Sequence, residues 1–291
     1  PWSDGKSPTT TTLAWFLASW AQVLSWTEAA RRFSTSWDVV FEAVRRAVEW
    51  GKAHRKLDNI TAIGVDELAW KKGHRYLTLV YQVDGACRRL LWIGQDRTAK
   101  TFNEFFNWLG TERTGKLRFV ISDMWKAFLG TVARRANQAI HVLDRFHVAQ
   151  LCNKAVDEVR RSEARELRKA GDQATLKHTR WVLLKRRANL SRTQRGRLRE
   201  LLKINLATVK AYLLKDDLRF FWNYKSPRHA GRFLDGWIYS AVATRIPPVV
   251  KLAKTLDQHR DLLLNWFRAR GELAMGAVEG MNNKARVTTK L

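Results

Sequence analysis

The chain has 291 residues, of which 53 are Lys or Arg and 27 are Asp or Glu, giving a formal net charge of +26. Such an excess argues against an enzyme of small neutral metabolites and indicates a polyanionic partner, first nucleic acid and second an anionic membrane surface. Hydrophobic residues make up 45% of the chain, which excludes a disordered basic tail. The two cysteines, Cys87 and Cys152, lack zinc-knuckle or disulfide-framework spacing, and no apolar run reaches the ~20 residues of a membrane span.

The N-terminal region, residues 1–56, has helical periodicity. Residues 27–33 and 37–50 are predicted helices, joined by a polar turn at 34–36, so the pair is a candidate helix-turn-helix. An ordinary αα-hairpin is the alternative. Basic residues on and after the second helix favour DNA binding, and the candidates for phosphate contacts are Arg45, Arg46, Lys52 and Arg55.

From residue 60 the spacing of the apolar residues changes from that of a helix to that of β-strands. Residues 57–144 are predicted to be an α/β region. Strands are expected at 60–65, 76–83, 88–93, 117–121 and 140–143, and helices at 98–109 and 125–136. This β-β-β-α-β-α-β order is that of a ribonuclease-H-like core, in which three antiparallel strands are followed by two parallel ones.

Residues 145–272 read as nearly continuous helix, and we expect a large α-helical insertion there. Residues 151–200 carry 15 Lys and Arg against 6 Asp and Glu, a net charge of +9, which suits contacts with phosphates. Aromatic and basic residues alternate at 219–225, a mixture that could stack on single-stranded bases, although packing in a helical core is the favoured interpretation.

Two acidic residues follow apolar strands. The run ending at Val65 is followed by Asp66, and the run ending at Ile121 is followed by Ser122 and Asp123. In the expected fold these strands are neighbours, so the two carboxylates would lie side by side. Each alone is compatible with a structural helix cap, but together at these positions they predict metal ligands.

A third acidic residue, Glu279, lies in residues 273–291, which we expect to be a further helix of the core. Glu279, Asn283 and Arg286 share one face at helical spacing, and Lys284 lies beside them. Glu279 would complete a three-carboxylate cluster suited to two Mg²⁺ ions, with Mn²⁺ as a substitute. Asn283 and Lys284 could then hold phosphate or a DNA end, and Arg286 is a further DNA-binding candidate.

Asp144 and His147 follow the fifth predicted strand. They are candidates for an auxiliary role, as a fourth carboxylate and a proton shuttle. The equally weighted structural alternative pairs Asp144 with Arg145 or with a helix N-terminus.

Five segments, in this order, resemble the DDE transposases of bacterial insertion sequences, of the ISL-three type. They are Ile-Gly-Val-Asp66-Glu, Ile-Ser-Asp123-Met-Trp-Lys-Ala-Phe, Val-Leu-Asp144-Arg-Phe-His147-Val, Leu-Asn265-Trp-Phe and Val-Glu279-Gly-Met-Asn-Asn-Lys-Ala-Arg. The resemblance implies that Asp66, Asp123 and Glu279 are a catalytic and metal-binding triad that cuts and joins DNA. It also implies a DNA-binding helix-turn-helix, terminal inverted repeats as the DNA partner, a homodimer or larger assembly, no membrane association, and a cytoplasmic, nucleoid-associated location.

The chain departs from the pattern of that family in three places. It lacks an N-terminal cysteine-bearing segment, it stops at Leu291 in a basic stretch, and Met275 stands where a polar residue is expected. The first two departures, with the start at Pro1, predict a fragment of a longer protein. The alternatives in function are a catalytically decayed transposase that acts as a DNA-binding repressor and a structure-specific nuclease of the same fold.

Overall fold

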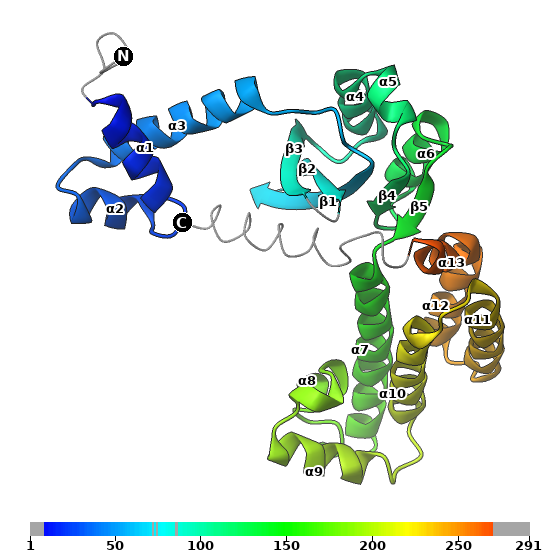
Figure 1. Cartoon of the computed structure of the whole chain (residues 1–291). Coiled ribbons are helices and arrows are strands. Elements are labelled where there is room, and N and C mark those ends of the chain that lie inside the picture. The colour runs from blue at the N-terminus through cyan, green and yellow to red at the C-terminus, as the bar shows by residue number, and fades with distance from the viewer. Residues whose placement is uncertain (1–8, 72, 74, 85–86, 270–291) are drawn as a thin grey trace. The chain divides into compact units, whose positions relative to one another are not determined.

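The computed structural model describes residues 9–269 except 72, 74, 85 and 86, and it divides into two compact units, Pro1–Asn59 and Ile60–Leu291 (Figure 1). The predicted C-terminal helix, with Glu279, Asn283, Lys284 and Arg286, lies outside the described residues. Within the described ranges, no helix combines the length and the apolar character needed to cross a membrane.

From residue 9 onward, where its description starts, the first unit contains three helices, α1 (Thr11–Trp20), α2 (Trp26–Arg32) and α3 (Trp37–His54). Helices α2 and α3 occupy the two predicted stretches, although α3 runs four residues beyond the expected end. Ser25 and Ser36 are their N-caps, because each hydroxyl accepts a hydrogen bond from a backbone amide of the first turn. The small core consists of Ala14, Leu17, Ala29, Ala30, Val40 and Ala43.

The second unit begins with a five-stranded sheet of order β3-β2-β1-β4-β5. Its strands are β1 (Ala62–Lys71), β2 (Arg75–Asp84), β3 (Cys87–Gln95), β4 (Phe119–Ser122) and β5 (Ile140–Leu143). The first three strands are antiparallel, β4 pairs parallel with β1, and β5 pairs parallel with β4. This confirms the predicted directions and the predicted proximity of the first and fourth strands.

Helices α4 (Ala99–Leu109) and α6 (Lys126–Arg135) connect the strands at the predicted places, and a short helix that was not predicted, α5 (Thr111–Gly115), precedes β4. Helix α4 packs on α6, with the rings of Phe102 and Phe128 5.3 Å apart. It also contacts β3, where Phe105 lies 6.0 Å from Trp92. These aromatic contacts hold the crossover helices on the sheet.

The first strand corrects a prediction. It does not end at Val65, because β1 continues through Asp66 to Lys71 and pairs with β2 over that length. Its pairing with β4, however, covers only Ala62–Gly64. Asp66 therefore lies inside a strand but just beyond the point at which the parallel neighbour stops pairing.

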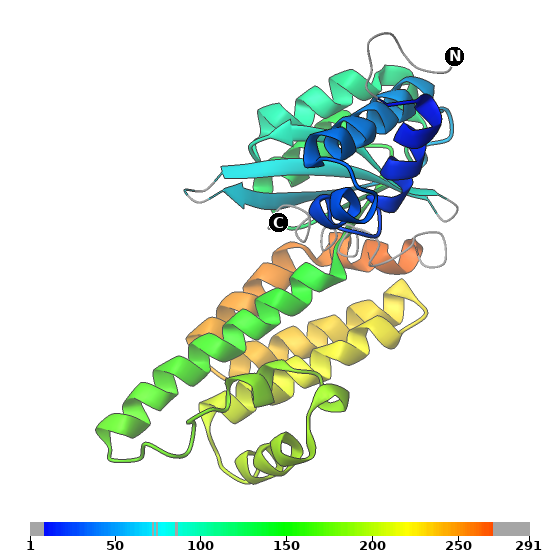
Figure 2. The ribbon, with the colours of Figure 1, turned by 90° about the vertical axis from the view of Figure 1, so that its left-hand side faces the viewer.

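After β5 the chain is helical, as predicted. The elements are α7 (Arg145–Lys169), α8 (Arg180–Leu184), η1 (Arg187–Asn189), α9 (Arg192–Leu201), α10 (Ala207–Leu218), η2 (Arg219–Asn223), α11 (Pro227–Ala243), α12 (Pro247–Gln258) and α13 (Arg260–Arg268). Helix α7 packs along α10 and α12, and α11 packs on α12 (Figure 2). Helix α13 contacts β5, where the Asn265 side chain donates a hydrogen bond to the carbonyl of His141 at 2.8 Å. One hydrophobic core is thus continuous from the sheet into the helices.

Candidate active site

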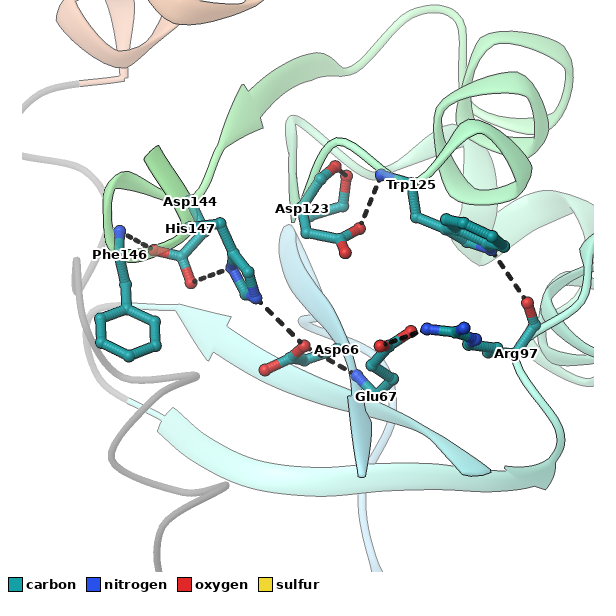
Figure 3. A network of polar contacts seen from close by, with 9 residues as sticks. Asp66, Glu67, Arg97, Asp123, Trp125, Asp144, Phe146 and His147 are labelled. Atoms are coloured by element: carbon teal, nitrogen blue, oxygen red, sulfur yellow. Dashed lines mark hydrogen bonds and ion pairs between the residues drawn. The ribbon is translucent and has the colours of Figure 1, made fainter. Parts of the chain in front are cut away.

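Three acidic residues from adjacent strands gather at one edge of the sheet (Figure 3). Asp66 comes from β1, Asp123 follows β4, and Asp144 follows β5. The backbone amide of Asp144 donates to the carbonyl of Ser122 at 2.8 Å, so the ends of β4 and β5 are joined next to Asp123. Parallel strands bring their carboxyl ends to the same edge, and this places Asp123 and Asp144 together.

The carboxylate of Asp66 is buried, with 7% of the residue exposed. Its Oδ1 accepts a hydrogen bond from the amide of Glu67 at 2.7 Å. The pKa of Asp66 is raised to about 6, chiefly by burial and to a smaller extent by the nearby carboxylates of Asp123 and Asp144, while His147 and the amide of Glu67 act in the opposite direction. A carboxylate in this setting favours either a proton or a neighbouring cation.

Asp123 is positioned by the turn that leads into α6. Its Oδ1 accepts from the amide of Trp125 at 3.0 Å, and its carbonyl accepts from the hydroxyl of Ser122 at 2.8 Å. The same hydroxyl lies 2.7 Å from Nε2 of His141 in β5. Burial raises the pKa of Asp123, and the charge of Asp144 adds to the shift.

His147, in the first turn of α7, lies between two of the carboxylates. Its Nε2 is 3.8 Å from Oδ1 of Asp66, and its Nδ1 is 3.4 Å from Oδ2 of Asp144, an ion-pair distance longer than a well-formed hydrogen bond. Burial lowers the pKa of His147, but Asp144, Asp66 and Asp123 outweigh it, and the net pKa is raised. Asp144 also caps α7 by accepting from the amide of Phe146 at 2.9 Å, as the structural alternative predicted.

Glu67 and Arg97 extend the cluster on the opposite side of β1, and the sequence motifs gave them no role. Nη1 of Arg97 lies 2.7 Å from Oε1 of Glu67, and the guanidinium stacks over Tyr76 at 4.0 Å and over Trp125 at 4.7 Å. The indole of Trp125 donates to the carbonyl of Arg97 at 3.0 Å. Arg97 thus ties the strand of Asp66 to the turn of Asp123.

One carboxylate oxygen in this group has no hydrogen-bond partner among the described residues. Oε2 of Glu67 is buried and, within the described part of the chain, has no hydrogen-bond partner. Burial raises the pKa of Glu67, although Arg97 opposes the shift. A buried, unpaired carboxylate oxygen is costly, so this oxygen is available for an additional ligand or a bridging water.

The structure therefore brings together four of the predicted site residues, Asp66, Asp123, Asp144 and His147 (Figure 3). The described residues alone form no group of three or more His, Cys, Asp or Glu side chains that could hold a metal ion. The other predicted members, Glu279, Asn283, Lys284 and Arg286, fall outside the described ranges, so the predicted triad stays a prediction.

The predicted DNA-contacting residues of the first unit lie on or just after α3. Arg45 bonds to Glu42 at 2.8 Å and to Glu49 at 2.7 Å, and Arg46 bonds to Glu42 at 3.2 Å. The two arginines together lower the pKa of Glu42 to about 2. Lys52 is in the last turn of α3, and Arg55 is its C-cap. Part of the positive charge on this helix is therefore neutralised within the helix itself.

Comparison with known proteins agrees with the family resemblance that the motifs indicated. A family model described as "Transposase", of the DDE ISL-three type, matches residues 63–291. The chain therefore belongs to the ISL-three family of DDE transposases, as the five motifs predicted.

Curated relatives from two organisms agree with this assignment. The chain is 33% identical to the transposase for insertion sequence element IS1001 of Bordetella parapertussis, over 89% of this chain and 63% of that protein. It is 30% identical to the transposase for insertion sequence element IS1557 of Mycobacterium tuberculosis, over 96% of this chain and 66% of that protein. The chain thus spans slightly less than two thirds of the length of these relatives.

Proposed function

We propose that this chain is the catalytic portion of a transposase that cuts DNA at the ends of an insertion sequence and joins those ends to new DNA. The observation that carries the proposal is the convergence of Asp66 and Asp123 at neighbouring strands of a chain that belongs to a DDE transposase family. The proposed core is ribonuclease-H-like, because its strand order and directions match those expected for that fold.

The residues present fit divalent metal ions. Asp66 and Asp123 offer oxygen ligands, burial raises the pKa of each, and Oε2 of Glu67 is a buried oxygen without a hydrogen-bond partner in the described chain. Hard cations such as Mg²⁺ or Mn²⁺ prefer oxygen ligands and would relieve the repulsion among these carboxylates. We propose that Asp66, Asp123 and Glu279 hold two ions, which supply Lewis-acid activation of water or of a DNA 3′-hydroxyl and stabilisation of the leaving oxygen.

The remaining residues of the site act through position. His147 contacts Asp66 and Asp144 and so fixes the orientation of the carboxylate at the centre of the site. Arg97 holds β1 and the turn after β4 at a constant separation through Glu67 and Trp125. Both restrict the freedom of groups that must approach the phosphate, which is how a rigid site lowers the barrier to phosphoryl transfer.

The first unit supplies the proposed recognition of the terminal inverted repeats. Its helices α2 and α3 are joined by a short turn, and α3 carries Arg45, Arg46 and Lys52. We propose that α3 contacts DNA as the second helix of a helix-turn-helix. A dimer or larger assembly follows from the need to bring two element ends together.

The test is cleavage of duplex DNA carrying the element's terminal repeats, with Mg²⁺ added, by the wild-type chain and by Asp66→Asn, Asp123→Asn and Glu279→Gln. Each substitution should abolish strand cleavage, because it removes a charge but keeps the size of the side chain. Binding to the repeats, measured by fluorescence anisotropy, should be nearly unchanged. Normal cleavage by any of the three variants overturns the triad, and cleavage of branched DNA in preference to repeats would make the chain a structure-specific nuclease.

A further inference from the structure

A basic pocket lies beside the first turns of α7, on a different face from His147. It has a volume of about 360 Å³, within the ~300–1,000 Å³ range of pockets that hold small ligands. Helix α7 contributes Arg145, Val148 and Cys152, which share one face at helical spacing, and the rest of the wall comes from the end of α8, the end of α10 and η2. Arg145 directly follows Asp144, so their Cα atoms are ~3.8 Å apart.

The lining of this basic pocket has far more positive than negative charge. Five of its side chains are cationic: Arg145, Lys185, Arg186, Lys215 and Arg219. Among the described residues that line it, Asp216 is the single carboxylate, and it is paired with Arg219 at 3.1 Å. Burial and the neighbouring Arg186 lower the pKa of Arg145, and neither arginine has a carboxylate partner in the described chain. An anion bound between two neighbouring cationic side chains reduces the repulsion between them.

The basic pocket is also preformed. Nζ of Lys215 donates to the carbonyls of Leu183 and Leu184, the latter at 3.2 Å, and to Oδ1 of Asn153 at 3.2 Å. These bonds join α7, α8 and α10 around the cavity. The guanidinium of Arg145 lies 5.4 Å from the ring centre of the buried Trp222, a cation–π contact that limits its movement. Binding an anion here would therefore require little ordering of the Arg145 and Lys215 side chains.

One of the residues that line the basic pocket is an exposed aromatic residue. Phe220 of η2 is 49% exposed, whereas its neighbours Phe221 and Trp222 are packed in the core. The predicted core packing of the aromatic stretch at 219–225 therefore holds for Phe221 and Trp222. It does not hold for Phe220, which is exposed. An exposed ring next to cationic side chains is the combination that holds an unpaired base and its phosphate.

We propose that the basic pocket binds a phosphate of the DNA strand next to the active site, with an unpaired base of that strand stacked on Phe220. The proposal rests on the proposed function, because it takes DNA as the substrate. Arg145 and Arg186 offer their guanidinium groups to the phosphate, whereas Lys215, whose three ammonium hydrogens are donated to Leu183, Leu184 and Asn153, contributes its charge. Arg145 directly follows Asp144, so the basic pocket begins at the same turn of α7 as the carboxylates of the candidate active site. The basic pocket would hold the strand end in position after its partner strand is separated.

The test compares Arg186→Glu and Phe220→Ala with the matched control Arg232→Glu. Arg232 is an exposed residue of α11 outside the basic pocket, and its substitution changes the net charge by the same amount as Arg186→Glu. Binding of the full chain to a labelled duplex with a short unpaired tail, and to the same duplex with a blunt end, is measured by anisotropy in EDTA at several salt concentrations. Because phosphate contacts are independent of sequence, an arbitrary sequence suffices.

We expect Arg186→Glu to weaken binding of the tailed duplex about tenfold more than Arg232→Glu does, and to lower the salt slope by about one. Phe220→Ala should weaken binding of the tailed duplex about tenfold and leave binding of the blunt duplex unchanged. Inorganic phosphate and a mononucleotide serve as competitors. If either displaces the tailed duplex from the wild-type chain at micromolar concentration, the source of the phosphate is a free ligand rather than the DNA backbone, and the proposal as stated is overturned.

Equal binding by Arg186→Glu and Arg232→Glu would also overturn the proposal. The melting temperature of each variant shows whether it is folded, and Arg186→Gln repeats the comparison with a smaller change of charge. Because binding is measured without metal, the outcome does not depend on cleavage. If Arg186→Glu and Arg232→Glu bind the tailed duplex equally and the wild-type chain cleaves DNA, only the proposal for the basic pocket is overturned. If the two variants differ in binding but the wild-type chain does not cleave DNA, only the proposed function is overturned.

Discussion

His147 lies 3.8 Å from Asp66 and 3.4 Å from Asp144, so a single imidazole connects the middle of β1 to the N-terminus of α7. The two carboxylates come from strands that are not neighbours, because β4 lies between β1 and β5. His147 therefore links carboxylates on either side of β4, the strand that Asp123 follows. A change at His147 should disturb the orientation of the carboxylates without removing any of them.

Replacing His147 by Gln should lower the rate of strand cleavage by about 10- to 100-fold and raise the Mg²⁺ concentration needed for half-maximal cleavage, as substitutions next to metal ligands do. Binding of the repeats should be unaffected, since we assign their recognition to α3 of the first unit and not to the carboxylates that His147 contacts. The measurement is a cleavage time course over a Mg²⁺ titration. A lower rate at an unchanged Mg²⁺ requirement would contradict an orienting role for His147 toward Asp66.

Removing Arg97 should loosen the connection between β1 and the turn after β4. Arg97→Ala leaves the half-buried Glu67 without its ion-pair partner, and a buried group without a partner costs ~1–3 kcal/mol of folding free energy. Arg97→Lys keeps the charge but loses the planar stacking on Tyr76 and Trp125, so we expect a smaller loss of stability. Urea denaturation gives both values.

The matching control is Glu67→Gln, alone and with Arg97→Ala. If the two residues act as a pair, the double variant should be less destabilised than the sum of the single variants. Strict additivity would show that Arg97 contributes only through its aromatic contacts.

The sheet could be predicted because its buried strands are short apolar runs and its hairpin has an Asp-Gly turn signal. Asp66 and Asp123 could be predicted as neighbours because the strand order puts β1 beside β4. The true length of β1 could not be predicted, since the polar pair at Asp66 and Glu67 interrupts the apolar run. That pair lies beyond the last residue of β1 that pairs with β4, Gly64.

The role of Arg97 could not be predicted from the sequence. Its partner Glu67 is 30 positions away, and its position in a loop carries no periodicity. The same limit applies to the aromatic stretch at 219–225, where helical spacing does not distinguish Phe220, at the surface, from Phe221, in the core. In both cases the deciding contacts come from elements that are distant in the chain.

Glu163 of α7 stabilises the start of α10. Its two carboxylate oxygens accept from the amides of Ala207 and Thr208, each at 2.8 Å, and the N-cap residue of α10, Leu206, has no side chain that could do this. Glu163→Ala should cost ~1–2 kcal/mol of folding free energy, because it leaves two helix N-terminal amides without partners. Glu166→Ala, at an exposed position of the same helix, is the control and should change stability by less than ~0.5 kcal/mol. Equal midpoints of urea denaturation for the two variants would contradict the capping role.

His141 should make the folded chain sensitive to mild acid. Burial, together with the nearby His259, lowers the pKa of His141 to about 4, while the unfolded chain keeps a value near ~6.5. The unfolded state therefore takes up the proton first. The contribution of the neutral imidazole to stability is complete above pH ~6.5 and is lost as the pH falls toward 4, by up to ~3 kcal/mol.

His141→Gln removes this titration and keeps a polar group near the hydroxyl of Ser122, which lies 2.7 Å from Nε2 in the wild-type chain. The free energy of unfolding, measured by urea denaturation between pH 4 and pH 7, should therefore fall more steeply for the wild-type chain than for the variant. Because both proteins share every other titrating group, the difference between their slopes isolates His141. Parallel curves would mean that His141 is protonated in the folded chain as readily as in the unfolded one, and that its contact with Ser122 survives the added charge.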